Sequence, residues 1–182
     1  MKKLFLALTL ALAMQAPVLA RADAPVNVLL AGSDASNAIS IKLTPDGRSY
    51  VIDSVVPLEV GGSVCVNPPG MPTELICQAP AVASFEMNAI GGDDTVLVSG
   101  KVLIPVTVRS GPGNDYIVGG GGSDKLVGGE GNDRLVGRRG EDLLLGGGGS
   151  DILIGGSDDD MLRGGLGSDR LLAGPGANKT RQ

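Results

Sequence analysis

Seven consecutive nine-residue units fill residues 110–172: SGPGNDYIV, GGGGSDKLV, GGEGNDRLV, GRRGEDLLL, GGGGSDILI, GGSDDDMLR and GGLGSDRLL. The sixth position is aspartate in every unit, at Asp115, Asp124, Asp133, Asp142, Asp151, Asp160 and Asp169. The eighth position is Ile or Leu in every unit, from Ile117 to Leu171. A fixed period of this kind is the signature of a stacked repeat architecture, so these units decide the fold.

Each unit predicts a tight loop followed by one short strand. Glycines at the first, second and fourth positions permit positive φ and close backbone approach, which turns loop carbonyl oxygens inward. The last three positions are rich in Val, Leu and Ile, and strand alternation places the eighth position on the opposite face from the seventh and ninth. Two successive units make one coil with strands on opposite sides. Stacked coils then form parallel ladders around a column of leucines, which predicts an all-β fold.

Stacking separates the aspartates into two rows, one on each edge of the coils, because alternate units share an edge. The first row contains Asp115, Asp133, Asp151 and Asp169, and the second row contains Asp124, Asp142 and Asp160. Like charges in a row repel, and a cation between neighbouring loops removes the repulsion. Ca²⁺ takes six to eight oxygen ligands in flexible geometry, and two carboxylates with about four loop carbonyls supply them, whereas Mg²⁺ fits less well.

The loop glycines complete the predicted calcium sites through their carbonyl groups. The glycines predicted at these sites are Gly111, Gly113, Gly120, Gly122, Gly129, Gly131, Gly147, Gly149, Gly165 and Gly167. A flexible glycine-rich linker is the alternative interpretation, but a linker leaves the columns of Asp and Leu unexplained.

The pattern G-G-x-G-x-D-x-U-x resembles the haemolysin-type calcium-binding repeat of the RTX family. The resemblance covers residues 110–172 closely and residues 89–172 more loosely. It implies a right-handed parallel β-roll, calcium held in the loops, and folding triggered outside the cell. The fourth unit departs from the pattern with Arg138 and Arg139, which place positive charge beside a cation site, and the sixth unit has Asp158 at the fourth position.

Residues 89–96 look like a degenerate unit, with Asp94 in the sixth position and Val96 in the eighth. We expect the Asp94 loop to stack on the edge that carries Asp115, with residues 99–101 turning on the opposite side and residues 102–109 returning. A further calcium site at Asp94 and a plain β-turn that caps the roll are both consistent with this segment.

The flanking segments predict three further regions. Residues 1–22 read as a secretory signal peptide. Lys2 and Lys3 precede an apolar stretch that is too short to cross a bilayer, and small residues suited to signal-peptide cleavage follow it. Residues 23–88 read as a β cap for the open end of the roll, with short strands and turn signals. Its Cys65 and Cys77 are the only cysteines, and an even pair in an exported chain favours a disulfide. Residues 173–182 read as a decaying C-terminal tail.

Composition limits the functions that remain. The chain has no histidine, which excludes Ser-His-Asp and Cys-His catalysis and His-ligated metals, and its net charge of −5 argues against nucleic-acid binding. The outward positions are apolar near the middle of the roll, at Leu143, Leu145, Ile152 and Ile154, which indicates either β-propensity alone or a surface for self-association or a protein partner. We predict a secreted or periplasmic, non-enzymatic calcium-binding protein. The alternative is an accessory part of a secreted toxin or hydrolase system.

Overall fold

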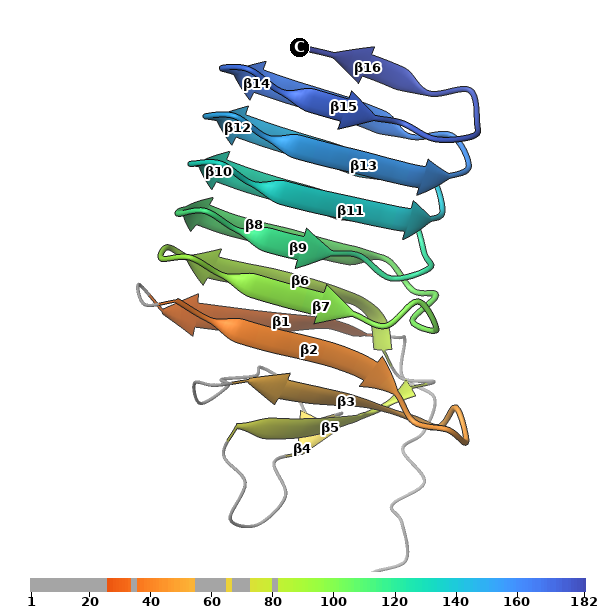
Figure 1. Ribbon diagram of the computed structural model, residues 1–182. Helices are drawn as coiled ribbons and strands as arrows, with labels where there is room; N and C mark the ends of the chain where they lie inside the picture. Colours follow the sequence, from red (N-terminus) through yellow and green to blue (C-terminus); the bar gives the residue numbers. More distant parts are fainter. Residues whose placement is uncertain (1–25, 34–35, 55–64, 67–72, 80–81) are drawn as a thin grey trace, which may run out of the picture.

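The computed structural model describes residues 26–33, 36–54, 65–66, 73–79 and 82–182. The predicted signal peptide therefore lies outside the described residues. The described chain folds into two sheets that face each other along one stack of coils (Figure 1). No helix among the described residues is long and apolar enough to cross a membrane.

One sheet has seven strands in the order β1-β6-β8-β10-β12-β14-β16. All of its pairs are parallel. Its strands are β1 (Val26–Ser33), β6 (Val82–Ile90), β8 (Val106–Pro112), β10 (Lys125–Glu130), β12 (Leu143–Gly148), β14 (Met161–Leu166) and β16 (Lys179–Arg181). In the repeats, each residue pairs with the residue at the same unit position one coil later, as Leu126 does with Leu144.

The other sheet has nine strands in the order β15-β13-β11-β9-β7-β2-β3-β5-β4. Parallel pairing runs from β15 to β2, and the last strands, β3, β5 and β4, pair antiparallel and close the N-terminal end. Its strands are β15 (Arg170–Leu172), β13 (Ile152–Ser157), β11 (Arg134–Arg139), β9 (Tyr116–Val118), β7 (Thr95–Val98), β2 (Ala38–Leu43), β3 (Ser49–Ser54), β5 (Glu74–Gln78) and β4 (Cys65–Val66). The predicted all-β roll with parallel ladders is confirmed.

A column of aliphatic side chains fills the space between the sheets, as the repeat predicts. The eighth-position residues from Ile117 to Leu162 are each 0% exposed, and only Leu171, in the last unit, is partly exposed. At the N-terminal end the column continues into Tyr50 and Phe85, whose rings meet edge to face with centroids 5.1 Å apart. The two rings join the nine-stranded sheet to the seven-stranded sheet where the coils begin.

The parallel coils extend further in both directions than the repeat indicates. β1 pairs parallel with β6, and β2 pairs parallel with β7, so strands upstream of residue 89 already belong to the stack. At the other end, β16 lies in the predicted tail and pairs parallel with β14. Strand pairing depends on backbone hydrogen bonds rather than on the repeat letters, which is why it continues where the pattern fades. The division into cap, roll and tail stays a prediction.

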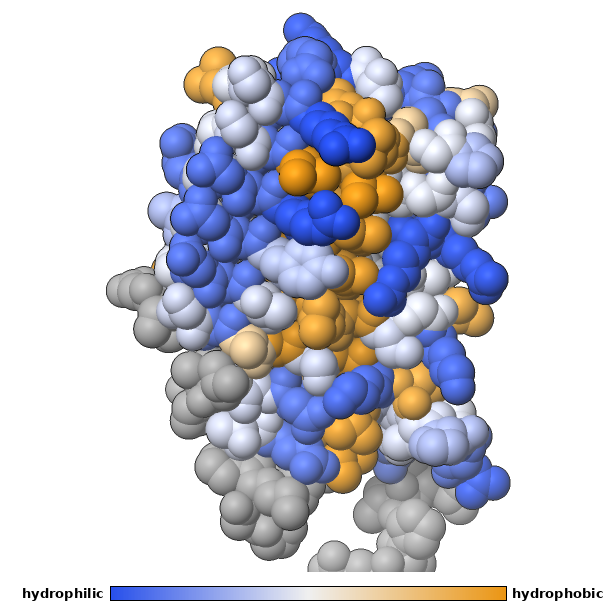
Figure 2. All heavy atoms as spheres, in the orientation of Figure 1, coloured by the Kyte–Doolittle hydropathy of each residue, from blue (hydrophilic) through white to orange (hydrophobic). Residues whose placement is uncertain are grey.

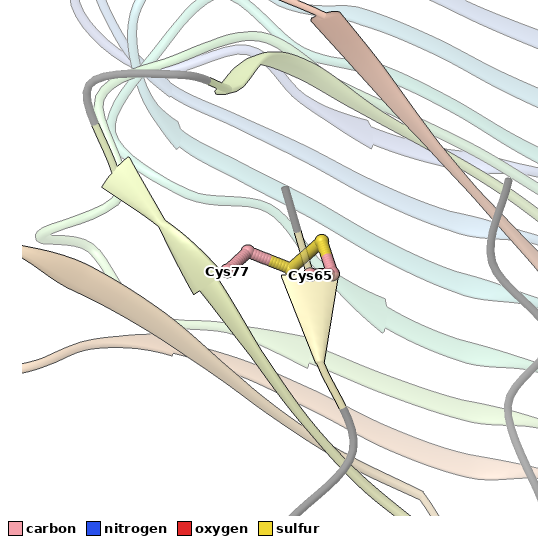
Figure 3. The surroundings of a disulfide bond; sticks show 2 residues. All are labelled: Cys65 and Cys77. Carbon is pink, nitrogen blue, oxygen red and sulfur yellow. A yellow bond between two sulfur atoms is a disulfide. The ribbon is translucent and has the colours of Figure 1, made fainter. Parts of the chain in front are cut away.

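The predicted disulfide is present in the antiparallel end of the nine-stranded sheet. Cys65 and Cys77 are bonded to each other and join β4 to β5 (Figure 3). The pair closes a loop with a sequence separation of 12. Closing a loop of this size stabilises a fold by about 3 kcal/mol in the chain-entropy model.

The outward face on the side of the nine-stranded sheet carries an apolar band between hydrophilic margins (Figure 2). The four apolar residues singled out in the sequence, Leu143, Leu145, Ile152 and Ile154, are each half-buried. Neighbouring side chains in a parallel ladder cover one another, which lowers the exposure of each.

Replacing Leu144 by alanine should lower the free energy of unfolding by about 2–5 kcal/mol, because the side chain is fully buried and its loss leaves a cavity. The matched control is Leu145→Ala, the half-buried neighbour on the outward face of the same strand. Urea unfolding with calcium present measures both changes. Equal losses in the two variants would contradict the assignment of the eighth position to the core.

Candidate calcium-binding rows

The two predicted rows of aspartates are present, one on each edge of the stack. In the first row, the backbone N–H of each aspartate donates to Oδ1 of the aspartate one coil later, over N–O distances of 2.8–3.0 Å from Asp94 to Asp169. The second row repeats the arrangement from Asp124 through Asp142 to Asp160. Asp94 therefore stacks on Asp115 as expected, and one carboxylate oxygen of each aspartate binds the coil before it.

The other carboxylate oxygen is buried without a hydrogen-bond donor in almost every member of the rows. These atoms are Oδ2 of Asp94, Asp115, Asp133, Asp142, Asp151, Asp160 and Asp169. A buried carboxylate oxygen that lacks a donor costs several kcal/mol, and such atoms in native proteins require an explanation. The repetition of the same deficiency at seven positions indicates a common partner other than the protein.

Backbone carbonyl groups lie beside these unpaired oxygens. A methyl group placed on Gly137, at the first position of its unit, would overlap Asp142 Oδ2 and lie 2.7 Å from the carbonyl oxygen of Gly155. The same pair of neighbours, an Oδ2 of the same unit and a carbonyl oxygen of the next coil, surrounds Gly128, Gly146 and Gly155. Each loop thus gathers a carboxylate oxygen and a carbonyl oxygen, both of which are hard ligands suited to calcium.

Burial raises the pKa of the row aspartates from Asp94 to Asp160 because the ionised form loses its hydration. The pKa rises to about 6 at Asp133 and to about 8 at Asp142. At Asp142 the negative charges of Asp124, Asp160 and Asp158 add to the effect of burial, and the backbone N–H of Asp124 opposes it. When no cation is bound, the folded state therefore favours the protonated form of these carboxyl groups over the ionised form. A bound cation would stabilise the ionised form instead.

The ligand set fits calcium better than a transition metal. No group of three or more His, Cys, Asp or Glu side chains gathers around a common point in the part of the chain that the structure describes. The ligands beyond the stacked carboxylates would therefore have to be backbone carbonyl oxygens. An all-oxygen set with few charged groups is typical of Ca²⁺ and excludes the soft ligands that zinc or copper prefer.

Comparison with known protein families supports this assignment. The family model described as the RTX calcium-binding nonapeptide repeat (4 copies) matches residues 109–144 and again residues 145–179. The chain carries RTX calcium-binding repeats. No curated protein and no solved structure matches the chain significantly. RTX nonapeptide repeats bind Ca²⁺, and the repeat is a structural element rather than a catalytic one.

Most of the RTX loops have the predicted backbone. Positive φ is found at eight of the ten predicted glycines, namely Gly111, Gly113, Gly129, Gly131, Gly147, Gly149, Gly165 and Gly167. Gly120 and Gly122 do not have positive φ. Their loop packs on the non-repeat turn at residues 99–105, where the backbone N–H of Gly121 donates to the carbonyl of Val102. Glycine is needed there for close approach, since a methyl group on Gly120 would lie 2.6 Å from the Val102 carbonyl oxygen.

The two departures from the RTX pattern keep the glycine-like backbone. Arg138 has φ 90° and Asp158 has φ 86°, in the left-handed region where a side chain is strained. The contacts that they make oppose this strain. Asp158 Oδ2 accepts from the backbone N–H of Gly140, and Arg138 Nη1 donates to the carbonyl oxygens of Val98 and Gly119.

An asparagine precedes the first aspartate of one row, and another asparagine follows the last aspartate of the other row. The sequence pattern reveals only the second of these asparagines. Asn178, at the place of an eighth aspartate, accepts from the backbone N–H of Asp160 through its side-chain oxygen. Asn37 is buried before the first row, and its backbone N–H and Nδ2 both donate to Asp94 Oδ1. Asn37 lies far from the repeats in sequence, so spacing gives no signal for it.

A second ladder follows the fifth positions of the first row and is not among the predicted features. The backbone N–H of Asn132 donates to Asn114 Oδ1, and that of Ser150 donates to Asn132 Oδ1. Asp93 extends the ladder by accepting from the backbone N–H of Asn114. The recurrence of Asn or Ser at this position of the first-row units is the signal that could have revealed it. These exposed side chains hold the loops in register beside the buried aspartates.

Without calcium, the chain should become less stable as the pH rises from about 4 to about 8. An aspartate in the unfolded chain has its ordinary pKa of 3.8, whereas the pKa in the folded chain is about 6 at Asp133 and about 8 at Asp142. The folded state therefore binds more protons in this window and loses stability as they dissociate. Urea midpoints in a chelator should fall between pH 5 and pH 8, and excess calcium should reverse the trend because Ca²⁺ binds the ionised carboxylates.

The variant Asp142→Asn should flatten the fall in stability above pH 6, and Glu141→Gln, which alters the exposed neighbour, should leave it unchanged. A calcium-free midpoint that rises with pH in the wild-type chain would contradict the electrostatic state assigned to the rows.

Proposed function

We propose that this protein is exported, folds when Ca²⁺ binds between the RTX loops, and acts outside the cytoplasm as a non-catalytic structural or interaction module. The observation that carries the proposal is the set of seven buried carboxylate oxygens without a donor. Calcium ions between neighbouring loops supply the missing partner, and each ion balances the charge of two carboxylates. The proposed ligands are these aspartates and the carbonyl groups of the loop glycines.

The proposed folding depends on the free calcium concentration of the compartment in which the chain lies. Where free calcium is scarce, the rows hold unpaired or protonated carboxyl groups, and the loops lack the ligand that offsets their burial. Where calcium is abundant, binding free energy becomes folding free energy, because the sites exist only when the coils are stacked. We infer that the coils complete their folding after export.

Two features of the chain support export. The first residues combine Lys2 and Lys3 with an apolar stretch and a following segment of small residues, which is the composition of a secretory signal peptide. The bond between Cys65 and Cys77 is typical of oxidising compartments and is rare in the cytosol. The interaction role is assigned to the outward sheet faces, where Leu145 on β12 and Ile154 on β13 are half-buried.

A calcium titration followed by far-UV circular dichroism tests the proposal. The purified chain should gain β signal cooperatively with a midpoint of about 10⁻⁴–10⁻³ M calcium, the range of extracellular calcium modules. Magnesium at the same concentrations is the matched control and should produce little change, because it resists loss of its water ligands.

A spectrum that ignores calcium would refute folding on ion binding. The intact mass of the same preparation, expressed in an exporting host, should correspond to a chain that begins at Asp23 with both cysteines oxidised. A mass that retains Met1 would refute the signal peptide.

A further inference from the structure

The loop at residues 119–124 matches the repeat letters at every required position, as the identical loop at residues 146–151 does, but it is the exception in the structure. Its sequence GGGGSD has glycine at all required positions. Yet its aspartate, Asp124, has no unpaired oxygen, because Oδ2 accepts a 2.6 Å hydrogen bond from the backbone N–H of Gly120. Among Asp94 and the seven repeat aspartates, it is the one whose Oδ2 has a protein donor. Asp124 therefore lacks the deficiency that points to calcium elsewhere.

A positive charge of the protein itself reaches this loop. Arg138, one coil later on the same edge, points its guanidinium back over the loop, and Nη1 donates to the carbonyl oxygen of Gly119 at 2.9 Å and to that of Val98. Gly119 is buried, and it occupies the first position of its unit. First-position carbonyls lie beside carboxylate oxygens of the preceding coil, as that of Gly155 does at Asp142 and that of Gly137 does at Asp124. The guanidinium thus binds a carbonyl of the kind that is proposed to bind calcium.

The coil before this loop explains why one positive charge suffices. Val106 stands where the second row would have a preceding aspartate, and its backbone N–H donates to Asp124 Oδ1. The gap between the two loops therefore holds one carboxylate rather than two. A guanidinium balances a single carboxylate, whereas Ca²⁺ would leave a net positive charge beside the existing arginine.

We propose that Arg138 is the built-in cation of the loop at residues 119–124, so that Asp124 binds no calcium while the aspartates with unpaired oxygens do. This inference rests on the proposed calcium binding by the other loops. It also gives the strained backbone of Arg138 a role, since from this position of the next coil its side chain reaches the carbonyl oxygen of Gly119. In the second row, Arg138 then supplies the positive charge at the loop of Asp124, and Ca²⁺ supplies it at the loops of Asp142 and Asp160.

Counting bound calcium in variants of the full chain tests the inference, with equilibrium dialysis against Ca²⁺ as the measurement. Asp124→Asn should bind as many ions as the wild-type chain, whereas Asp142→Asn should bind fewer. Arg138→Gly restores the repeat pattern, suits the positive φ, and should bind one ion more than the wild-type chain. Adding Asp124→Asn to that variant should remove the extra ion. Arg139→Gly, at the exposed neighbour, is the matched control and should keep the wild-type count.

Loss of an ion in Asp124→Asn, or an unchanged count in Arg138→Gly, would overturn the inference. The two asparagine variants decide it even if Arg138→Gly fails to fold. A wild-type chain that binds no calcium would refute the proposed function instead. In that case, amide hydrogen exchange of residues 119–124 decides the inference separately: exchange that is faster in Arg138→Gly than in Arg139→Gly supports it, and equal exchange overturns it.

Discussion

The stack depends on the way each row aspartate divides its carboxylate between two tasks. Oδ1 accepts the backbone N–H of the aspartate one coil earlier, as Asp151 does for Asp133 over 2.8 Å, and this bond sets the coil spacing at the edge. Oδ2 is left buried beside a glycine and a carbonyl oxygen, without a donor. The first task holds the coils together, and the second makes their edges unstable without a cation. Folding and ion binding are therefore coupled through the same side chain.

The interior of the roll strengthens this coupling. A single coil buries one leucine on each side and cannot exclude water from it, so the column from Ile117 to Leu162 becomes dry only when several coils are stacked. Stacking in turn buries the carboxylates. A roll of small aliphatic residues has no large aromatic core to offset that cost, apart from Tyr50 and Phe85 at the N-terminal end. Cation binding at the edges and apolar packing in the column thus stabilise the fold together.

The sequence predicts the repeated parts of this molecule because their physics is local and periodic. The inward leucines and the two rows follow from a period of nine and from strand alternation, and the stacking of Asp94 follows from its place in a degenerate unit. The ends are different. The parallel pairing of β1 with β6 and of β16 with β14 depends on the geometry of a stack that already exists, and the letters of these strands do not repeat. Asn37 ends the first row from a distant segment, which periodicity cannot reveal.

The loop at residues 119–124 shows where pattern and structure separate. Its letters are ideal, but a loop site is made by two adjacent coils, and the coil before it has Val106 and a turn in place of a repeat. The sequence alone places the charge of Arg138 beside a cation site, whereas in the fold its guanidinium binds the Gly119 and Val98 carbonyl oxygens. The chemistry of an RTX loop is therefore decided by its neighbours in the stack as well as by its own residues.

The most direct test of the central claim is a crystal structure grown with calcium, with the ions located by anomalous scattering. The account predicts peaks within coordination distance of the Oδ2 atoms that lack a donor, in both rows, with loop carbonyl oxygens completing each site. A map without such peaks, in which these oxygens instead contact water or a protein donor, would contradict it.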